Sequence, residues 1–287
     1  MDQEYIQELQ ARGIRIEIIR TFADLKRVHN EFVVGKSGFY SNFLLLIGSP
    51  GSGKSTLFRS AKEIYYTNDA VSAVGLYRMA YHNIDKPLAF DDVDDCLINR
   101  QALALIRVLG EPGEKMPCWE KMNVALAKEG VPNKFTTTSR ICIICNQLPK
   151  INMAMKSVLD RAKTIVFWPT AEEIQKFVLT WWPAEHADVA EFIGMNLDKI
   201  VVPTIRWYVD AKREKLLGND WRNWLLKQWY NENPRMAVIA EIFTSGIPKG
   251  KAMEEEWHRR TGLGRAIFYR YLSQYRAQHE PPATANP

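Results

Sequence analysis

A glycine-rich segment between residues 48 and 55 has the residue types that bind phosphate. Its sequence, Gly-Ser-Pro-Gly-Ser-Gly-Lys-Ser, fits the pattern G-x-x-x-x-G-K-[ST]. Glycines let backbone N–H groups converge on phosphate oxygens, Lys54 adds a positive charge, and the Ser55 hydroxyl is a ligand for Mg²⁺. A helix that begins here also points its positive dipole end at the anion. The predicted nucleotide contacts are Gly48, Ser49, Pro50, Gly51, Ser52, Gly53, Lys54, Ser55 and Thr56.

Two carboxylates follow a short apolar run farther along the chain. Asp91 and Asp92 come directly after residues 88–90, Leu-Ala-Phe. In phosphoryl transfer, a carboxylate at the end of a strand beside the phosphate loop holds Mg²⁺, and a second one polarises the attacking water. We therefore predict that Asp91 serves the metal and Asp92 the water. A solvated acidic turn is the alternative interpretation.

Four apolar runs predict the strands that must position these groups: residues 43–47, 87–90, 141–145 and 164–168. Continuous apolar runs are typical of parallel strands that are buried on both faces, and helical stretches separate the four runs. One helix is expected from about Lys54 to Tyr65, and the interval to Asp91 leaves room for one short strand and one helix near 73–82. The fold class is therefore α/β, with a P-loop parallel sheet over residues 35–170. An N-terminal helical segment, residues 1–34, precedes it in the chain.

Helical patterns dominate the sequence after Pro169. They cover residues 171–182, 185–195, 204–217 and 220–230. These patterns predict an all-helical lid domain over 171–232. A small helical module is expected over 233–278, and the Pro-rich end, 279–287, is predicted to be a disordered tail.

The composition excludes several other classes of protein. The chain has 287 residues, of which 46% are hydrophobic and 25% charged, with four cysteines. These values exclude a disordered chain and a small disulfide scaffold. No apolar run approaches the ~20 residues of a transmembrane helix, and the acidic N-terminus does not resemble a signal peptide. We therefore expect a cytoplasmic protein with no membrane partner.

The motifs, in this order, resemble the AAA+ ATPases over roughly residues 35–230. Asn146 follows the run 141–145, in the place of the sensor-1 residue that orients the lytic water. Arg161 precedes the next run and looks like the arginine finger that reaches a neighbouring subunit's nucleotide. Arg206 is similar to the sensor-2 arginine that begins a lid helix. Ordinary surface ion pairs are the alternative for both arginines, and a strand-end cap is the alternative for Asn146.

This resemblance implies ATP and Mg²⁺ as cofactors and a homo-oligomer, either a ring or a helical assembly. The catalytic residues that it implies are Asp92, Asn146, Arg161 and Arg206, and whether Arg206 acts in cis or in trans stays open. Asp92 departs from the family pattern, which mostly has the longer glutamate. The Asp-Asp form resembles replication initiators, helicase loaders and transposition-associated ATPases, which implies a helicase or transposase as partner.

Three functions are therefore compatible with the sequence. The first is an ATPase that oligomerises on DNA and remodels or loads a replication or transposition complex, as in a mobile element. The second is an ATP-gated DNA-binding regulator with little turnover, which the short Asp92 favours. The third is a small-molecule P-loop kinase, against which the helical region after Pro169 argues.

Positive charge concentrates near the end of the chain. The net charge is +5, and residues 257–278 contain five arginines and no acid. The sequence around Gly262 resembles a helix-turn-helix with Leu263 in its core and a recognition helix from Arg265 to about Gln274, whose inward residues are Ile267, Tyr271 and Leu272. The predicted DNA contacts are Arg259, Arg260, Arg265, Tyr269, Arg270 and Arg276. A protein-binding or structural helical hairpin is the alternative, since His258 stands where such motifs want a small residue.

Two further features need separate interpretations. Cys142 and Cys145 form a C-x-x-C pair on a predicted strand, where side chains three apart point to opposite faces, so we interpret both as core residues. The polar stretch 111–139 is either a pore-facing hairpin or a plain surface excursion. Within it, Lys115 and Lys121 are candidate DNA contacts.

Overall fold

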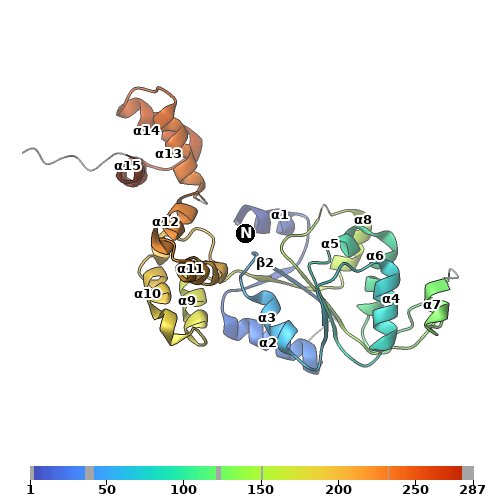
Figure 1. The fold of residues 1–287 in the computed structure, drawn as a ribbon. Coiled ribbons are helices and arrows are strands. Elements are labelled where there is room, and N and C mark those ends of the chain that lie inside the picture. The colour runs from blue at the N-terminus through green and yellow to red at the C-terminus, as the bar shows by residue number, and fades with distance from the viewer. Residues whose placement is uncertain (1–2, 36–41, 121–123, 150, 232, 280–287) are drawn as a thin grey trace, which may run out of the picture. The chain divides into compact units, whose positions relative to one another are not determined.

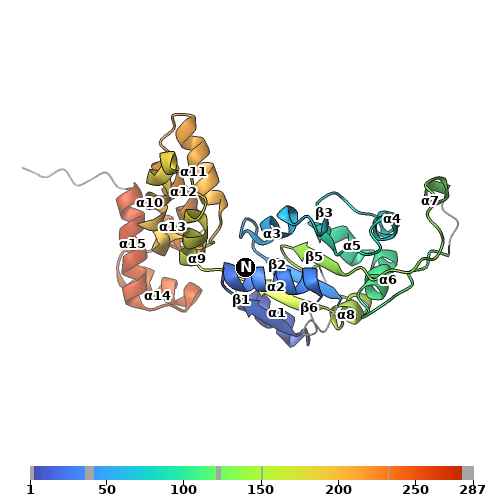
Figure 2. The same cartoon turned by 90° about the horizontal axis from the view of Figure 1, so that it is seen from below.

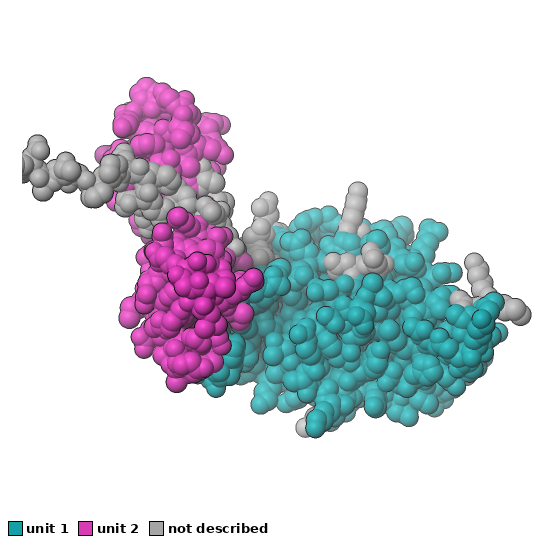
Figure 3. Space-filling view, in the orientation of Figure 1, with its two compact units in different colours: residues 1–182, 203–206 teal, residues 183–202, 207–287 magenta. Residues whose placement is uncertain are grey.

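The computed structural model describes residues 3–35, 42–120, 124–149, 151–231 and 233–279, and Figure 1 shows its fold. The chain divides into two compact units, which Figure 3 colours separately. Unit 1 comprises residues 1–182 and 203–206, and unit 2 comprises residues 183–202 and 207–287. Unit 1 contains the sheet, whereas the described part of unit 2 is helical.

Unit 1 is built on six parallel strands in the order β1-β6-β2-β5-β4-β3. The strands are β1 (Ile16–Ile19), β2 (Phe43–Gly48), β3 (Tyr65–Thr67), β4 (Leu88–Asp91), β5 (Ile141–Cys145) and β6 (Lys163–Phe167). Every residue of β2 and β5 is buried, as expected for apolar strands in the middle of a parallel sheet. The predicted α/β class with a parallel sheet is therefore confirmed.

Helices cover both faces of this sheet, as Figures 1 and 2 show. The helices of unit 1 are α1 (Gln3–Ala11), α2 (Phe22–Val34), α3 (Lys54–Ser60), α4 (Ala73–His82), α5 (Asp94–Ile98), α6 (Arg100–Leu109), α7 (Val124–Lys128), α8 (Met153–Leu159) and α9 (Ala171–Leu179). Alternate residues of β2, such as Phe43 and Leu45, share one core cluster with α1, α4, α5, α6 and α8. On the other face, Phe22 of α2 packs edge-on against Phe167 of β6, with ring centroids 5.2 Å apart.

Two local elements differ from the expectation. The predicted N-terminal helical segment 1–34 also contains β1, which pairs with β6 at the edge of the sheet. This strand gives little sequence signal because it has four residues, of which only one is buried. The helix expected to reach Tyr65 ends at Ser60, where Ala61 turns to an extended backbone, and Tyr65 begins β3 instead. The interval before Asp91 does hold one short strand and one helix, as expected.

The described helices of unit 2 follow the predicted pattern closely. They are η1 (Ala184–His186), α10 (Ala187–Gly194), η2 (Leu197–Lys199), α11 (Arg206–Leu216, which begins in unit 1), α12 (Trp221–Asn231), α13 (Pro234–Thr244), α14 (Lys251–Thr261) and α15 (Arg265–His279). Helix α9, which was predicted to belong to the lid, clusters with unit 1. The boundaries of the lid and of the C-terminal module stay predictions.

Helices α13, α14 and α15 enclose a core of their own. The predicted inward residues Tyr271 and Leu272 are buried and Ile267 is half-buried against this core. Its largest fully buried side chains are Trp257 and Phe268, which the sequence pattern did not single out. Helix α15 continues to His279, the first residue of the predicted tail, and the rest of that tail lies outside the described residues.

None of the helices in the described ranges combines the length and the hydropathy needed to cross a lipid bilayer.

Candidate nucleotide site

The predicted phosphate loop joins β2 to α3. Gly48 ends the strand, Lys54 begins the helix, and Ser55 and Thr56 lie in its first turn. Gly51 and Gly53 have φ values of 71° and 92°, a backbone region that glycine adopts without steric cost. A Cβ atom at Gly51 would also lie 2.1 Å from Thr204 Oγ1. The backbone conformation of the loop therefore favours glycine at both positions. At Gly51, a side chain would also collide with Thr204.

Lys54 is buried at the centre of this site, with 5% of its surface exposed. Its Nζ donates to Asn146 Oδ1 at 2.7 Å and to the Ser49 carbonyl at 3.4 Å. Burial lowers the pKa of the ammonium, while the carboxylates of Asp91 and Asp92 act in the opposite direction. Since an ammonium has three donors, one remains for a phosphate oxygen.

A second feature of the loop also fits a phosphate. Ser52 Oγ is buried and has no hydrogen-bond partner among the residues that the structure describes. Buried hydroxyls are normally hydrogen-bonded, so an unpaired one within a glycine-rich loop calls for a polar ligand. The loop therefore offers a hydroxyl and an ammonium to a triphosphate.

Asn146 connects the phosphate loop to the acidic strand. Because β5 lies between β2 and β4 in the sheet, the residue that follows β5 stands between Lys54 and Asp92. Asn146 Nδ2 donates to Asp92 Oδ1 at 3.2 Å. Asp92 itself has a φ of 54°, unusual for a residue other than glycine, and its N–H donates to the Ile144 carbonyl at 3.1 Å. Three side chains from separate elements thus form one hydrogen-bonded chain.

Asp91 has a different environment from Asp92. It is 4% exposed, and its Oδ2 accepts a hydrogen bond of 2.6 Å from the hydroxyl of Tyr66. Arg59 Nη2 donates in turn to the same hydroxyl at 3.2 Å, and its guanidinium lies 5.4 Å from the centre of the Tyr66 ring. Sequence reasoning missed Tyr66 and Arg59, because a Tyr-Tyr-Thr strand carries no signal of this contact.

The predicted metal ligands Ser55 and Asp91 are hard oxygen donors of the kind that Mg²⁺ prefers. No group of three or more His, Cys, Asp or Glu side chains suited to a metal occurs in the described parts of the chain. A nucleotide-bound Mg²⁺ needs no such group, since phosphates and waters supply most of its ligands. Tyr66 occupies one oxygen of Asp91, which leaves the other for the metal. The residues present therefore fit Mg²⁺ together with ATP.

The two predicted catalytic arginines lie at opposite ends of the strands of the sheet. Ile205 N donates to the Gly51 carbonyl at 2.8 Å, so Arg206 begins α11 directly beside the phosphate loop. Arg161 precedes β6, and Lys163 pairs with Leu44 near the amino end of β2, whereas the loop follows its carboxyl end. Arg161 is exposed and donates to the Ser157 carbonyl at 2.8 Å. The structure does not bring Arg161 to this chain's own loop.

Three of the six predicted DNA contacts are in ion pairs. Arg259 and Arg260 each contact Glu256 at 2.6 Å. Arg260 also contacts Glu241 at 2.7 Å, and Arg265 contacts Glu254 at 3.4 Å. These glutamates lie outside residues 257–278, so the arginine-only stretch of the sequence is not an uncompensated basic patch in the fold.

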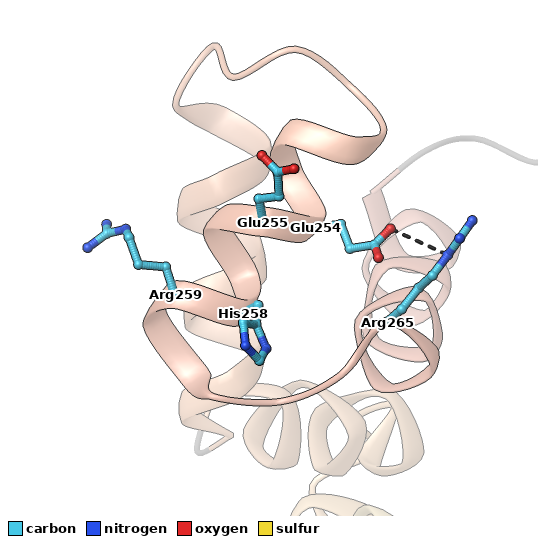
Figure 4. A pocket seen from close by; sticks show the side chains of 5 residues that line it. All are labelled: Glu254, Glu255, His258, Arg259 and Arg265. Carbon is cyan, nitrogen blue, oxygen red and sulfur yellow. Dashed lines mark ion pairs between the residues drawn. The ribbon is translucent and has the colours of Figure 1, made fainter.

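Figure 4 shows the side chains around a cavity of about 510 Å³ in this module. Glu254 and Arg265 point toward each other across the gap between α14 and α15, whereas Arg259 points away. The ring of His258 contacts the Leu263 carbonyl at 3.2 Å through Nδ1, and thereby bonds to the turn where a small residue was expected. The cavity has mixed charge, with both carboxylates and cations in its lining.

The other three predicted DNA contacts differ in accessibility. Arg270 is exposed and Tyr269 is 41% exposed. Arg276 is half-buried, with its guanidinium 6.0 Å from the centre of the Phe243 ring. Arg270 and Tyr269 are therefore the more accessible of these three residues.

The stretch 111–139 forms a hairpin that carries α7 (Figure 2). Antiparallel bridges join Lys115 to Thr137 and Cys118 to Lys134. Lys115 is 5% exposed, and burial lowers its pKa to about 8. Its interpretation as a candidate DNA contact is therefore wrong, because a side chain this buried does not reach a phosphate backbone. Lys121 lies outside the described residues.

Cys142 and Cys145 are buried on β5 without a disulfide, and burial raises the pKa of the Cys142 thiol well above its ordinary value. Both therefore behave as the predicted core residues.

Fold and site together define a P-loop α/β protein, in which a parallel sheet presents a phosphate loop beside two carboxylates. Among solved structures, the chain is similar to three variants of RuvB from Thermotoga maritima, each 12% identical. One has a TM-score of 0.42 and covers 90% of this chain and 88% of its own. The other two have TM-scores of 0.37, covering 94% and 89% of this chain and 85% of their own.

No protein-family model matches the chain. No curated protein matches it either. The function of the chain is therefore inferred from the residues of the site.

Proposed function

We propose that this chain is an ATP-hydrolysing AAA+ protein that oligomerises on DNA and remodels or loads a replication or transposition complex. The observation that carries the proposal is the hydrogen-bonded chain from Lys54 through Asn146 to Asp92. It couples a phosphate-binding cation to the carboxylate that would polarise water, with Asp91 buried beside them. Phosphoryl transfer needs this kind of positioning and charge compensation more than covalent chemistry.

Each residue of the site has a separate role in the proposed hydrolysis. ATP supplies the transferred phosphoryl group, and Mg²⁺ neutralises charge on its phosphates. Lys54 and the loop bind the phosphates, and Ser55 and Asp91 hold the metal. Asp92 orients the attacking water and accepts its proton, while Asn146 keeps the Asp92 carboxylate in place. Burial of Lys54 and Asp91 strengthens the interactions of these two residues, because the local dielectric constant around them is low.

The position of Arg161 at the amino ends of the strands supports an oligomer. A residue at the amino ends of the strands is remote from its own phosphate loop, and so it can serve a nucleotide only on a neighbouring copy. A head-to-tail interface of this kind generates a ring or a helical filament. Arg206, beside its own loop, acts in cis in this scheme.

DNA binding is assigned to the C-terminal helices. Arg270 and Tyr269 are accessible on α15, and Arg259 and Arg265 keep exposed guanidinium groups although they are ion-paired. Arginines of this kind contact phosphates as well as base edges. The mixed charge around them predicts moderate affinity that depends on salt.

An ATP-gated DNA-binding regulator with little turnover is the second candidate. Asp92 favours it, because its carboxylate is one methylene shorter than glutamate and is already bonded to Asn146. ATP turnover measured with and without DNA separates the two candidates. DNA-stimulated turnover supports the remodelling ATPase, whereas DNA binding that responds to ATP without turnover supports the regulator.

The basic assignment is tested by the binding of a fluorescent ATP analogue to the full chain. Lys54→Ala should abolish this binding, because it removes the buried ammonium of the loop. Lys62→Ala is the matched control, since Lys62 is exposed just beyond α3. Intact binding by the Lys54 variant would refute the assignment of the loop.

A further inference from the structure

The contact between Tyr66 and Asp91 follows from the register of two neighbouring strands. Tyr66 of β3 pairs with Ala89 of β4, and Asp91 is two residues beyond Ala89. Residues two apart in a strand share a face, so Asp91 is a diagonal neighbour of Tyr66, within reach of a long aromatic side chain. The tyrosine hydroxyl therefore meets the Asp91 carboxylate at 2.6 Å as a consequence of the sheet itself.

Arg59 determines the direction of this hydrogen bond. A guanidinium has donors and no acceptor, so Arg59 Nη2 must donate to the Tyr66 oxygen at 3.2 Å. The single hydroxyl proton of Tyr66 is then free to point at Asp91 Oδ2. The guanidinium carbon also lies over the ring, 5.4 Å from its centre, within the range of a cation–π contact. The two hydrogen bonds and the cation–π contact together hold one oxygen of the carboxylate in a fixed position.

We infer that Tyr66 is a positioning residue for Mg²⁺: it holds the Asp91 carboxylate in the orientation that presents its other oxygen to the metal, with Arg59 fixing the hydroxyl. This inference rests on the proposed function, since Asp91 serves a metal only if the loop binds a nucleotide. Groups that hydrogen-bond to metal ligands orient them, and their loss typically costs about 10–100-fold in metal affinity or activity.

The test measures how much Mg²⁺ the full chain needs to bind a fluorescent ATP analogue. Tyr66→Phe removes only the hydroxyl and should raise the half-saturating Mg²⁺ concentration about tenfold. Saturating Mg²⁺ should restore both analogue binding and kcat, which a general structural defect would not allow. Tyr65→Phe is the matched control, because it removes a hydroxyl from the adjacent residue of the same strand.

Arg59→Gln provides a second variant at an exposed position, and should raise the Mg²⁺ requirement by a smaller factor. Thermal melting shows whether Tyr66→Phe folds. If it does not fold, Arg59→Gln is the variant that tests the inference. An unchanged Mg²⁺ requirement in folded Tyr66→Phe overturns the inference and leaves the proposed function standing. A wild-type chain that binds no ATP analogue at any Mg²⁺ concentration overturns the proposed function and the inference with it.

Discussion

Asn146 links the two charged groups of the site, because its side-chain amide contacts a cation through its oxygen and a carboxylate through its nitrogen. Its oxygen accepts from the Lys54 ammonium and its nitrogen donates to the Asp92 carboxylate. Neither charged residue needs Asn146 to reach its own position, since each is placed by its own strand or helix. Asn146 instead fixes the orientation of the Asp92 carboxylate, since its Nδ2 donates to Asp92 Oδ1.

Asn146→Ala should therefore separate binding from hydrolysis. Lys54 and the loop remain, so the affinity for an ATP analogue should change little. The loss of a preorganised hydrogen-bond donor should lower kcat by about 10²-fold. Analogue titration and steady-state phosphate release measure the two quantities. A variant that loses nucleotide binding along with hydrolysis would show that Asn146 supports the loop rather than Asp92.

Some of the individual residues of the site could be predicted from their positions along the chain. The loop pattern is a local sequence, and Asp91 and Asp92 follow an apolar run, so their place at a strand end could be inferred without tertiary information. Asn146 also follows an apolar run, but its role was implied by the resemblance to the AAA+ family. Tyr66 could not be found in this way, because its contact depends on the register between β3 and β4. Register describes how two strands are aligned, so the sequence of one strand does not specify which residue lies opposite Tyr66.

Helix α14 is the element that changes the interpretation of the C-terminal module. It carries Glu254 and Glu256 as well as Arg259 and Arg260, so it supplies the acids that pair with its own arginines and with Arg265. The two arginines next to Glu256 lower its pKa to about 2, so it stays ionised at any physiological pH. Counting charges over residues 257–278 missed this compensation, because the helix extends before that window.

Glu256→Gln should therefore strengthen DNA binding. The change keeps the shape of the side chain, releases Arg259 from its carboxylate and leaves Arg260 paired with Glu241 alone. DNA affinity should rise several-fold at low salt, and the plot of log K against log[salt] should steepen by about one unit for each added phosphate contact. Fluorescence anisotropy with a labelled duplex and single strand, at several salt concentrations, measures both effects.

Glu255→Gln is the control for the Glu256 variant. It removes the same charge from the same helix, but Glu255 pairs with Lys251 and not with these arginines. Equal strengthening by both variants would indicate a general effect of net charge. Unchanged affinity in the Glu256 variant would favour a protein-binding or structural module.

Most elements could be predicted because the buried strands are continuous apolar runs and the helices have clear periodicity. Strand β1 escaped prediction because an edge strand of four residues, mostly unburied, lacks such a run. The end of α3 at Ser60 also escaped, since Tyr65 and Tyr66 are compatible with either a helix or a strand. In both cases the deciding interaction is pairing with a partner strand that is distant in the chain.

In the whole molecule, the phosphate loop and Arg161 lie at opposite ends of the strands, so a complete site would need residues from two subunits. If a site is completed by the neighbouring copy, each subunit contributes one half to each of two sites. Arg161→Ala should then lower hydrolysis by about 10³-fold or more and largely spare nucleotide binding. Lys54→Ala should abolish binding at its own loop but leave its Arg161 intact for the neighbour.

Mixing the two inactive variants tests this arrangement directly. In an equimolar mixture that exchanges subunits, half of the loops are intact, and half of those face a neighbour with an intact Arg161. Turnover should therefore recover to about a quarter of the wild-type rate per subunit, if each site needs one loop and one finger in a head-to-tail interface. If Arg161 acts on its own loop or not at all, the mixture will show only the mean of the two separate rates. Phosphate release measured after co-incubation, with each variant alone as the reference, distinguishes these outcomes.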